Sequence, residues 1–415
     1  RYGDRLSVRG WLETPPEWEA FSYRDYLARQ GVYTYIRKAR VDLLQHHQGN
    51  RILAAIYTLR RRALAQVYQL YPDPEASLLA GILLGVESGI PESVQQSFRD
   101  TGTAHIVAIS GFNITILAGL FFVLASRLFG RWWGALAAIL GIALYTLLVG
   151  SGPPVLRAAI MGGLSLFARQ VGRRQDGLNT LFFVAALMAL FDPDILWDVG
   201  FQLSFMATLG LLLYGDPLLE AFTHFAARFT SPENARRLAG PVGAFILITL
   251  AAQLTTLPVV AYHFRRISLS SLVANPAILP AQPAVMVLGG LAVVMGLIYQ
   301  PLGQLAAYLA WPFVVYTIRV VEWFANLPGG VLVLGSVTSV WVALFYIVLF
   351  GWTFAGPRLR AWFSDRVDLE EDSRVVPPAV FGVALVALAV LAILVWREAL
   401  TLPDGRLHLT VLDVG

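Results

Sequence analysis

The stretch that decides the fold is TGTAHIVAISGFNITILAGLFFVL, residues 101–124. It is mostly apolar and long enough to cross a bilayer as a helix, which needs about 20 residues. Its first half carries His105, Ser110 and Asn113. On a continuous helix these three side chains would share one side, because Ser110 and Asn113 lie roughly 140° and 80° round from His105. Lipid offers them no hydrogen bonds, so we expect that side to face protein or water.

The composition of the whole chain is that of a polytopic α-helical membrane protein. Hydrophobic residues make up 57% of its 415 residues, charged residues 14%, and the mean hydropathy is +0.63. A very large soluble core is the alternative, but several apolar runs approach or exceed the roughly 18 residues that span a bilayer. The absence of cysteine excludes disulfides, thiolate metal sites and cysteine nucleophiles. The net charge of +4 is compatible with a polyanionic partner and equally with arginine-rich cytoplasmic loops.

Apolar runs predict about ten membrane spans. We expect them at about 104–126, 132–150, 153–170, 178–191, 199–214, 239–262, 280–299, 303–325, 337–355 and 377–396. The connections after odd-numbered spans contain most of the loop arginines, namely Arg127, Arg131, Arg169, Arg173, Arg174, Arg228, Arg236, Arg237, Arg358, Arg360 and Arg366. The positive-inside rule places those connections in the cytoplasm and both soluble ends of the chain outside.

The chain divides into four regions in this interpretation. Residues 1–50 are predicted to be part of a small extracellular β domain, because Leu6 and Val8 alternate with polar residues. Two or three strands are too few for a stable sheet, so we expect the rest of that domain upstream. Residues 51–100 are predicted to form amphipathic and interfacial helices. Their first helix, 51–71, would lie on the membrane surface or dock on protein. Residues 101–398 would form the membrane domain.

Polar side chains within the predicted spans are candidates for a water-lined passage. In the sixth span Thr249, Gln253, Thr256 and His263 fall within roughly an 80° arc of a helix. Interhelical hydrogen bonding is the alternative explanation of that stripe. In the third span, Arg157 could hold an anion or extend its charge to the membrane interface.

Three further polar features lie in the chain, and the first is the pair Arg319 and Glu322 of the eighth span, which we expect to neutralise one another at a spacing of three residues. In the fifth span, Gln202 and Ser204 follow Asp198, which suits either a transport site or a helix cap with packing amides. Residues 268–283 contain Asn275 and several prolines, which predicts unwound backbone that lines a cavity or a plain surface loop. No complete catalytic constellation is present, and none of the six histidines belongs to a spaced metal-ligand motif. We therefore expect no catalytic residue, metal or cofactor in this chain.

Several segments together resemble the ComEC family of competence proteins. They are TGTAH at 101–105 with AISG at 108–111, SG at 151–152 with RA at 157–158, GFQLSF at 200–205, and LP at 257–258 with YHF at 262–264. FSYRDYLARQGV at 21–32 resembles the end of the family's OB-type domain. LHLTVLDVG at 407–415 resembles the first strand of its metallo-β-lactamase-like domain, so residues 399–415 would begin a truncated domain. Many relatives have His where this chain has Asn113, which hydrogen-bonds but does not titrate.

The resemblance implies a channel in the bacterial inner membrane that takes up single-stranded DNA during natural transformation, alongside other competence proteins. The metal-binding histidines of the nuclease-like domain would lie beyond Gly415, so we expect no nuclease activity from this polypeptide. The predicted channel lining is His105, Ser110, Asn113, Gln202, Ser204, Gln253, Thr256, His263 and Asn275. The residues predicted to contact DNA phosphates are Arg157, Arg265 and Arg266. Those predicted to guide DNA on the soluble domain are Arg24, Arg29, Arg37 and Lys38.

Two other classes of protein fit the same residues. A secondary transporter for a small solute also has broken helices and polar groups near the membrane midplane. A membrane scaffold would use its polar stripes for packing alone. A DNA passage, by contrast, must be hydrated and must offer donors to phosphates without holding them tightly.

Overall fold

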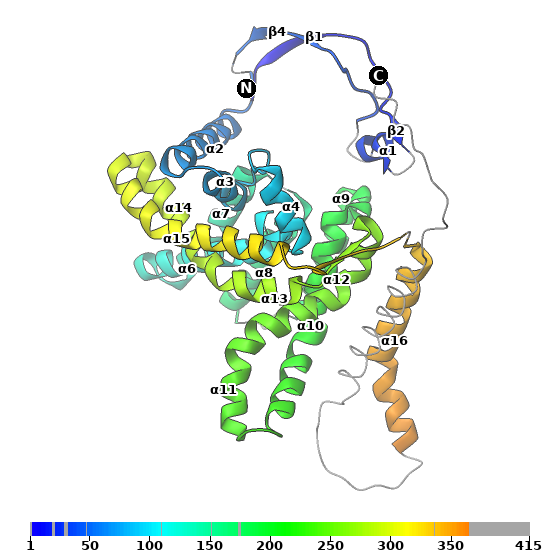
Figure 1. Ribbon diagram of the computed structural model, residues 1–415. Helices are drawn as coiled ribbons and strands as arrows, with labels where there is room; N and C mark the ends of the chain where they lie inside the picture. Colours follow the sequence, from blue (N-terminus) through cyan, green and yellow to red (C-terminus); the bar gives the residue numbers. More distant parts are fainter. Residues whose placement is uncertain are drawn as a thin grey trace.

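The computed structural model describes residues 2–18, 21–28, 32–46, 48–108, 110–150, 152–172, 176–335 and 337–364. These ranges are mainly helical and contain only short strands (Figure 1). The strands are β1 (Arg5–Arg9), β2 (Glu17–Trp18), β3 (Phe21–Ser22), β4 (Arg40–Gln45), β5 (Arg266–Ser268) and β6 (Val331–Val333). They form three antiparallel pairs within the described part of the chain, β1 with β4, β2 with β3 and β5 with β6.

The helices account for the membrane domain and its approach. The first nine are α1 (Tyr23–Ala28), α2 (Arg51–Leu70), α3 (Glu75–Leu84), α4 (Glu92–Asp100), α5 (Ala104–Val107), α6 (Gly111–Phe129), α7 (Arg131–Val149), α8 (Pro153–Gln170) and α9 (Gly177–Phe191). A 3-10 turn η1 (Pro193–Trp197) leads to α10 (Val199–Ala226) and α11 (Pro232–Val242). A π-helical segment η2 (Gly243–Leu247) joins α11 to α12 (Ile248–Phe264). The rest are α13 (Ser271–Ile278), η3 (Leu279–Ala281), α14 (Gln282–Ile298), α15 (Gln300–Ala325) and α16 (Ser339–Ser364).

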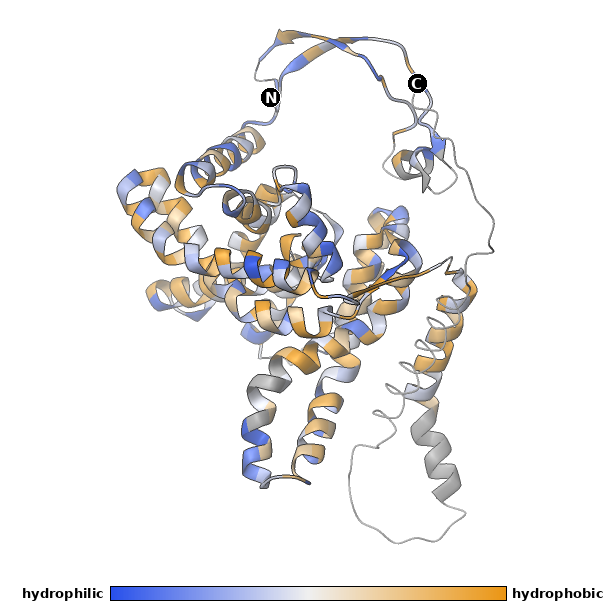
Figure 2. Cartoon of the chain, viewed as in Figure 1, coloured by the Kyte–Doolittle hydropathy of each residue, from blue (hydrophilic) through white to orange (hydrophobic). Residues whose placement is uncertain are grey.

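Six helical segments of the described chain are long and apolar enough to cross a membrane. They are Ala104–Phe129, Arg131–Val149, Val199–Ala226, Phe245–Phe264, Ser271–Ile298 and Gln300–Ala325. Large apolar side chains such as Ile298, Leu309 and Ile347 are more than 60% exposed, and Figure 2 shows hydrophobic residues along the helices that carry them. Such surfaces are those of a protein surrounded by lipid.

The predicted count of ten spans is not confirmed. The spans expected at 153–170 and 178–191 are helices α8 and α9, but α8 is less apolar and α9 has only 15 residues. The span expected at 337–355 falls in α16, whose apolar part is Ser339–Ala355. The span expected at 377–396 and the domain expected at 399–415 lie outside the described residues.

The span predicted at 104–126 matches the segment Ala104–Phe129, but α5 and α6 divide that segment into two helices. Helix α5 ends at Val107, Ala108 is extended with ψ 141°, and Ser110 is extended with ψ 164° immediately before α6. His105 and Asn113 therefore stand on different helices and share no helix face. Ser110 occupies the N-cap position of α6 without a side-chain cap, because its hydroxyl donates to the Asn113 Oδ1 at 3.2 Å.

Helix α3 is a short helix buried at the centre of the bundle. All of its residues from Ala76 to Leu84 are buried, and it packs against α2, α7, α14 and α15. Its 10 residues rise only about 15 Å, half the thickness of the hydrocarbon core. The Arg60 guanidinium of α2 donates to the Leu84 carbonyl at 3.0 Å and so caps the end of α3. The interfacial position predicted for residues 51–100 stays a prediction.

Helix α2 forms where the basic amphipathic helix was predicted. Asn50 caps it, accepting a hydrogen bond from the Ile52 backbone at 2.8 Å. Its buried residues Ile56, Ala63 and Val67 dock on the bundle. The docking alternative is thus realised, whereas contact with a membrane surface remains a prediction.

The front of the chain forms a two-stranded ribbon rather than a closed domain. β1 and β4 pair so that Val8 faces Val41, and both are about half exposed. Every residue of β4 is exposed. A lone ribbon is marginal in water, and the OB-type domain predicted for this region is not confirmed.

The end of α10 and the whole of α11 form a helical hairpin that projects from the body (Figure 1). The first part of α10 packs against α9 and α12. The predicted span at 199–214 matches this packed part, and Asp216 is the first exposed charged residue beyond it. The predicted span thus falls within the candidate segment Val199–Ala226, whose helix continues to Ala226.

Candidate functional site

Four segments that are far apart in the sequence meet at one place, which we call the junction. It consists of the starts of α6, α8 and α10 and the end of α12. Gly200 of α10 lies against Pro154 of α8, and Gly111 of α6 lies against Ala158. These segments carry the residues that first pointed to a family. The four segments are far apart in the sequence, so their proximity could not be predicted from it.

Arg157 is the central cation of the junction. Its Nε and Nη2 donate to the Ser204 Oγ of α10 at 3.0 and 2.6 Å, and its Nη1 lies 3.2 Å from the Met161 Sδ. The residue is only 6% exposed, so it does not extend its charge to the interface. Within the described ranges, no carboxylate lies within 4.0 Å of its guanidinium. A buried charge without an opposite charge is costly and marks a candidate anion site.

A second polar group of the junction has unused hydrogen-bonding capacity. Asn113 is 3% exposed, and its Oδ1 accepts a hydrogen bond from the Ser110 Oγ at 3.2 Å. Its Nδ2 is buried and has no partner among the described residues. An unsatisfied buried donor costs about 1–3 kcal/mol, so this amide favours an acceptor such as water or a phosphate oxygen.

A third contact of the junction joins α10 to α12. The Gln202 Oε1 lies 3.0 Å from the His263 Nε2, and the Gln202 Nε2 donates to the Leu196 carbonyl at 2.9 Å. Asp198 caps α10 through the Phe201 backbone at 2.8 Å, as its position predicted. Gln202 therefore acts as a packing amide in this structure.

The remaining polar stripe of α12 bonds partly to a neighbouring helix and partly to nearby backbone. Gln253 donates to the Ser271 Oγ of α13 at 2.8 Å. The Thr249 hydroxyl donates to the Phe245 carbonyl of η2 at 2.7 Å, and the Thr256 hydroxyl to the Ala252 carbonyl of α12 at 3.0 Å. Only Gln253 of these three thus makes an interhelical hydrogen bond, and the lining role of the stripe stays a prediction.

The turn between α4 and α5 is held against the loop between β5 and α13. Gly102 has φ +66°, and a Cβ there would lie 2.9 Å from the Ser271 Cβ, so only glycine fits. Nearby, the Arg266 Nη1 pairs with the Asp100 Oδ1 at 3.2 Å. The charge of Arg266 is thus compensated, which makes it a weaker candidate for phosphate contact than Arg157. Arg265 is exposed at the end of α12, with φ 51°.

Two other predicted lining residues lie apart from these contacts. His105 is exposed on α5. Asn275 is 5% exposed within α13, and its Oδ1 is buried without a partner among the described residues. Residues 271–278 are helical, so the unwound backbone predicted for residues 268–283 is wrong over most of its length. Pro276 is accommodated inside that short helix.

The predicted DNA-guiding residues belong to the ribbon and its connections. Arg24 pairs with Glu17 at 2.6 Å, which compensates its charge. Arg37 and Lys38 are exposed just before β4. Arg29 lies outside the described residues.

One buried polar residue was missed by the sequence reasoning. Gln282 at the start of α14 is 2% exposed, and both of its amide atoms lack partners within the described chain. Its signal was present, since it is an amide inside an apolar run between Pro280 and Pro283. No feature of the sequence indicated the contact between Met161 and Arg157.

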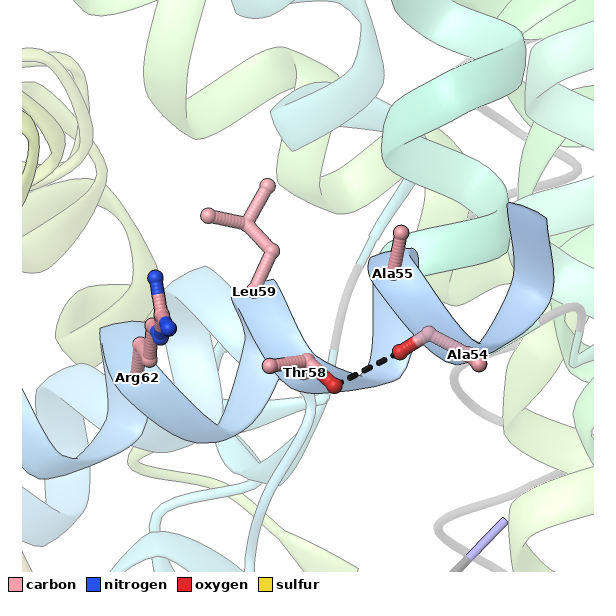
Figure 3. A pocket seen from close by; sticks show the side chains of 5 residues that line it. All are labelled: Ala54, Ala55, Thr58, Leu59 and Arg62. Atoms are coloured by element: carbon pink, nitrogen blue, oxygen red, sulfur yellow. Dashed lines mark hydrogen bonds between the residues drawn. The ribbon is translucent and has the colours of Figure 1, made fainter. Parts of the chain in front are cut away.

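A shallow depression on α2 lacks the converging polar groups of a binding site. It is lined by Ala54, Ala55, Thr58, Leu59 and Arg62, all from one helix (Figure 3). The Thr58 hydroxyl donates to the Ala54 carbonyl at 2.7 Å, so it is already used. Polar groups do not converge on it from several elements. No three possible metal-ligating side chains gather within the described ranges either.

The fold and the junction define an α-helical membrane protein with a buried, uncompensated arginine where several helices meet. A family model described as Competence protein matches residues 82–359. The chain therefore belongs to the competence protein family.

Three similar proteins illustrate the relationship. ComE operon protein 3 of Bacillus subtilis is 26% identical over 282 residues, covering 67% of this chain and 34% of that protein. Competence protein ComA of Neisseria gonorrhoeae is 29% identical, covering 60% and 34%. Recombination protein 2 of Haemophilus influenzae is 26% identical, covering 39% and 22%. The chain thus spans at most about a third of the length of these relatives. No solved structure matches it significantly.

Proposed function

We propose that the membrane domain is a passage through the bacterial inner membrane for single-stranded DNA during natural transformation. The names of the relatives support a role in competence. The observation that carries the proposal is Arg157, which is buried beside Ser204 without a carboxylate partner. A strand presents one phosphate charge per nucleotide and would supply the missing anion.

The proposed chemistry is transient contact rather than catalysis. Arg157 would donate to a phosphate oxygen as its bonds to the Ser204 hydroxyl are exchanged for charge-assisted ones. The Asn113 Nδ2 would offer a further donor from α6. One buried cation and a few amides hold a phosphate weakly enough for release, as conduction requires.

In this proposal the junction lies near the outer face of the membrane. The connections α7 to α8, α9 to α10 and α12 to α13 all follow even-numbered predicted spans, which have few arginines apart from Arg265 and Arg266. The ribbon β1–β4 would lie outside, where Arg37 and Lys38 could meet an incoming strand. Lipid and other competence proteins are the proposed partners.

Single-cysteine labelling tests the orientation, because the chain has no cysteine of its own. A label-accessible cysteine at Ser7 should react with an impermeant reagent added outside intact cells. One at Thr230, in the α10–α11 connection, should react only after the cells are opened. The reverse pattern would overturn the proposed topology.

Transport by the full-length protein tests the function directly. Cells that lack the protein should fail to accumulate fluorescent single-stranded DNA, and the restored gene should recover uptake. Proteoliposomes should accumulate an oligonucleotide but not inorganic phosphate. Uptake of phosphate alone would favour the small-solute transporter, and normal DNA uptake without the protein would refute the proposal.

A further inference from the structure

The α10–α11 hairpin extends past the start of α9, while α16 runs beside it, with the Thr353 Oγ1 2.8 Å from the Tyr214 hydroxyl oxygen (Figure 1). Helix α10 has 28 residues, about 42 Å, whereas the hydrocarbon core is about 30 Å thick. Gly177, the first residue of α9, packs against Leu212 of α10. Helix α9 therefore begins at the level of Leu212. We call residues 216–242, which lie beyond that level, the arm.

The tip of the arm lies beyond the lipid headgroups. If α10 begins at one boundary of the hydrocarbon core and stands upright, it ends about 12 Å past the other boundary. A headgroup layer is only about 5–8 Å thick. Asp216 and Glu220 are exposed on the way, as expected outside hydrocarbon.

Two aromatic rings are nevertheless exposed at this tip. Phe225 is 53% and Phe229 78% exposed, and their centroids are 5.2 Å apart with the ring planes at 62°. Lipid does not cover them at that distance from the hydrocarbon. Exposed large apolar side chains far from the bilayer indicate a binding surface.

The arm carries three arginines, Arg228, Arg236 and Arg237, and three carboxylates, Asp216, Glu220 and Glu233. Arg228 and Arg236 are exposed, and no ion pair is found for either within the described residues. The nearby Arg237 is compensated by Glu233 at 2.9 Å. Aromatic faces next to free arginines form the combination that binds single-stranded nucleic acid, by stacking bases and contacting phosphates.

The size of the apolar surface favours a strand over a protein partner. A stable protein interface buries about 800 Å² on each side. Here Ser231, Glu233 and Asn234 are exposed polar residues immediately beyond the rings. Two rings provide stacking platforms for only a few bases, which is enough for a flexible strand.

We propose that the tip of the arm binds single-stranded DNA on the cytoplasmic side, with bases on Phe225 and Phe229 and phosphates at Arg228 and Arg236. The proposal rests on the proposed function, because the arm is cytoplasmic only if the junction is outer. Helix α10 carries Ser204 at the junction and continues directly into the arm. A strand leaving the passage would thus meet the tip next.

Binding to the full-length protein in nanodiscs tests the proposal. An environment-sensitive dye on a cysteine at Thr230 should respond to a 20-nucleotide oligo-dT. The double variant Phe225→Ala/Phe229→Ala should weaken the response at least tenfold. Phe183→Ala/Phe191→Ala is the matched control, because those rings are also exposed but lie on α9, and its affinity should stay unchanged.

A second variant keeps the test independent of the rings. Arg228→Gln/Arg236→Gln should reduce the slope of log affinity against log salt concentration by about 1.4, about 0.7 for each lost phosphate contact. Both double variants should retain the unfolding temperature of the parent protein. An unchanged affinity and salt slope would overturn the proposal, as would a dye response to anionic vesicles but not to oligo-dT.

The same variants separate this proposal from the proposed function. If cells need the protein for DNA uptake but the tip variants bind oligo-dT like the parent, the arm proposal fails and the passage stands. If uptake is normal in cells without the protein, the passage itself fails. A tip that then still binds oligo-dT would show nucleic-acid binding without transport.

Discussion

Replacing Arg157 with glutamine should impair transport far more than stability. The substitution removes a charge that is 6% exposed, and burying such an ion costs several kcal/mol. It also removes two hydrogen bonds to Ser204, at 3.0 and 2.6 Å. Each bond to a charged group contributes about 1.5–3 kcal/mol. Because these contributions oppose each other, the free energy of unfolding should change by less than about 2 kcal/mol.

DNA uptake should fall strongly even though the free energy of unfolding changes little. The variant loses its contact with phosphate, and a charge-assisted bond of about 1.5–3 kcal/mol corresponds to roughly a 10- to 150-fold effect. Arg157→Lys keeps the charge but lacks the planar set of N–H donors of arginine, so its DNA uptake should lie between that of the parent protein and that of Arg157→Gln. Arg169→Gln is the control, because it removes an exposed arginine from the other end of the same helix.

Two measurements decide the outcome. Accumulation of fluorescent DNA is measured in cells whose own copy is deleted and replaced by each full-length variant. Thermal unfolding of the purified variants reports stability. Normal uptake by Arg157→Gln would refute the phosphate role, and a loss of more than about 4 kcal/mol would show a mainly structural role.

Three other changes test the surrounding structure. Arg60→Ala should lower the free energy of unfolding by about 1–3 kcal/mol, because it leaves the buried carbonyl at the end of α3 without its hydrogen-bond donor. Arg61→Ala, which changes an exposed neighbour, should leave the free energy of unfolding nearly unchanged. Equal effects of the two substitutions would contradict the role of Arg60 as a cap. Gly102→Ala should destabilise by about 1–2 kcal/mol or more, since φ is +66° and its Cβ would meet a serine side chain; an unchanged unfolding temperature would count against this. The hydrogen bond from His46 lowers the pKa of Asp4 below its ordinary 3.8, so this contact stabilises the folded ribbon above that pH and is lost as pH falls through the lowered pKa. Asp4→Asn should abolish that acid dependence in amide-exchange protection of β1 and β4, and an identical pH profile would refute it.

Features that depend on near neighbours in the chain were predictable. Apolar runs predicted the helices, because any segment in lipid must satisfy its own backbone. Asp198 was recognised as a possible cap, and Arg319 pairs with Glu322 at 3.2 Å as expected from their spacing of three. These contacts are set by helix geometry within about one turn.

Features that depend on packing between distant segments were not predictable. The contact of Arg157 with Ser204 joins residues 47 positions apart, and that of Gln202 with His263 joins residues 61 apart. Helical periodicity placed His263 on a polar stripe but could not show whether water or a neighbouring helix faced it. The break before Ser110 was missed because the apolar pattern continues across it.

By itself, the sequence determined that this is a polytopic helical membrane protein and which segments resemble one family, because length, hydropathy and local order are written in the chain. Only the tertiary structure decided that those segments converge on one uncompensated arginine, and that α10 continues past the start of α9 into the arm. The physical reason is that a buried charge is defined by what surrounds it. Those surroundings come from helices that are distant in sequence and adjacent only after packing.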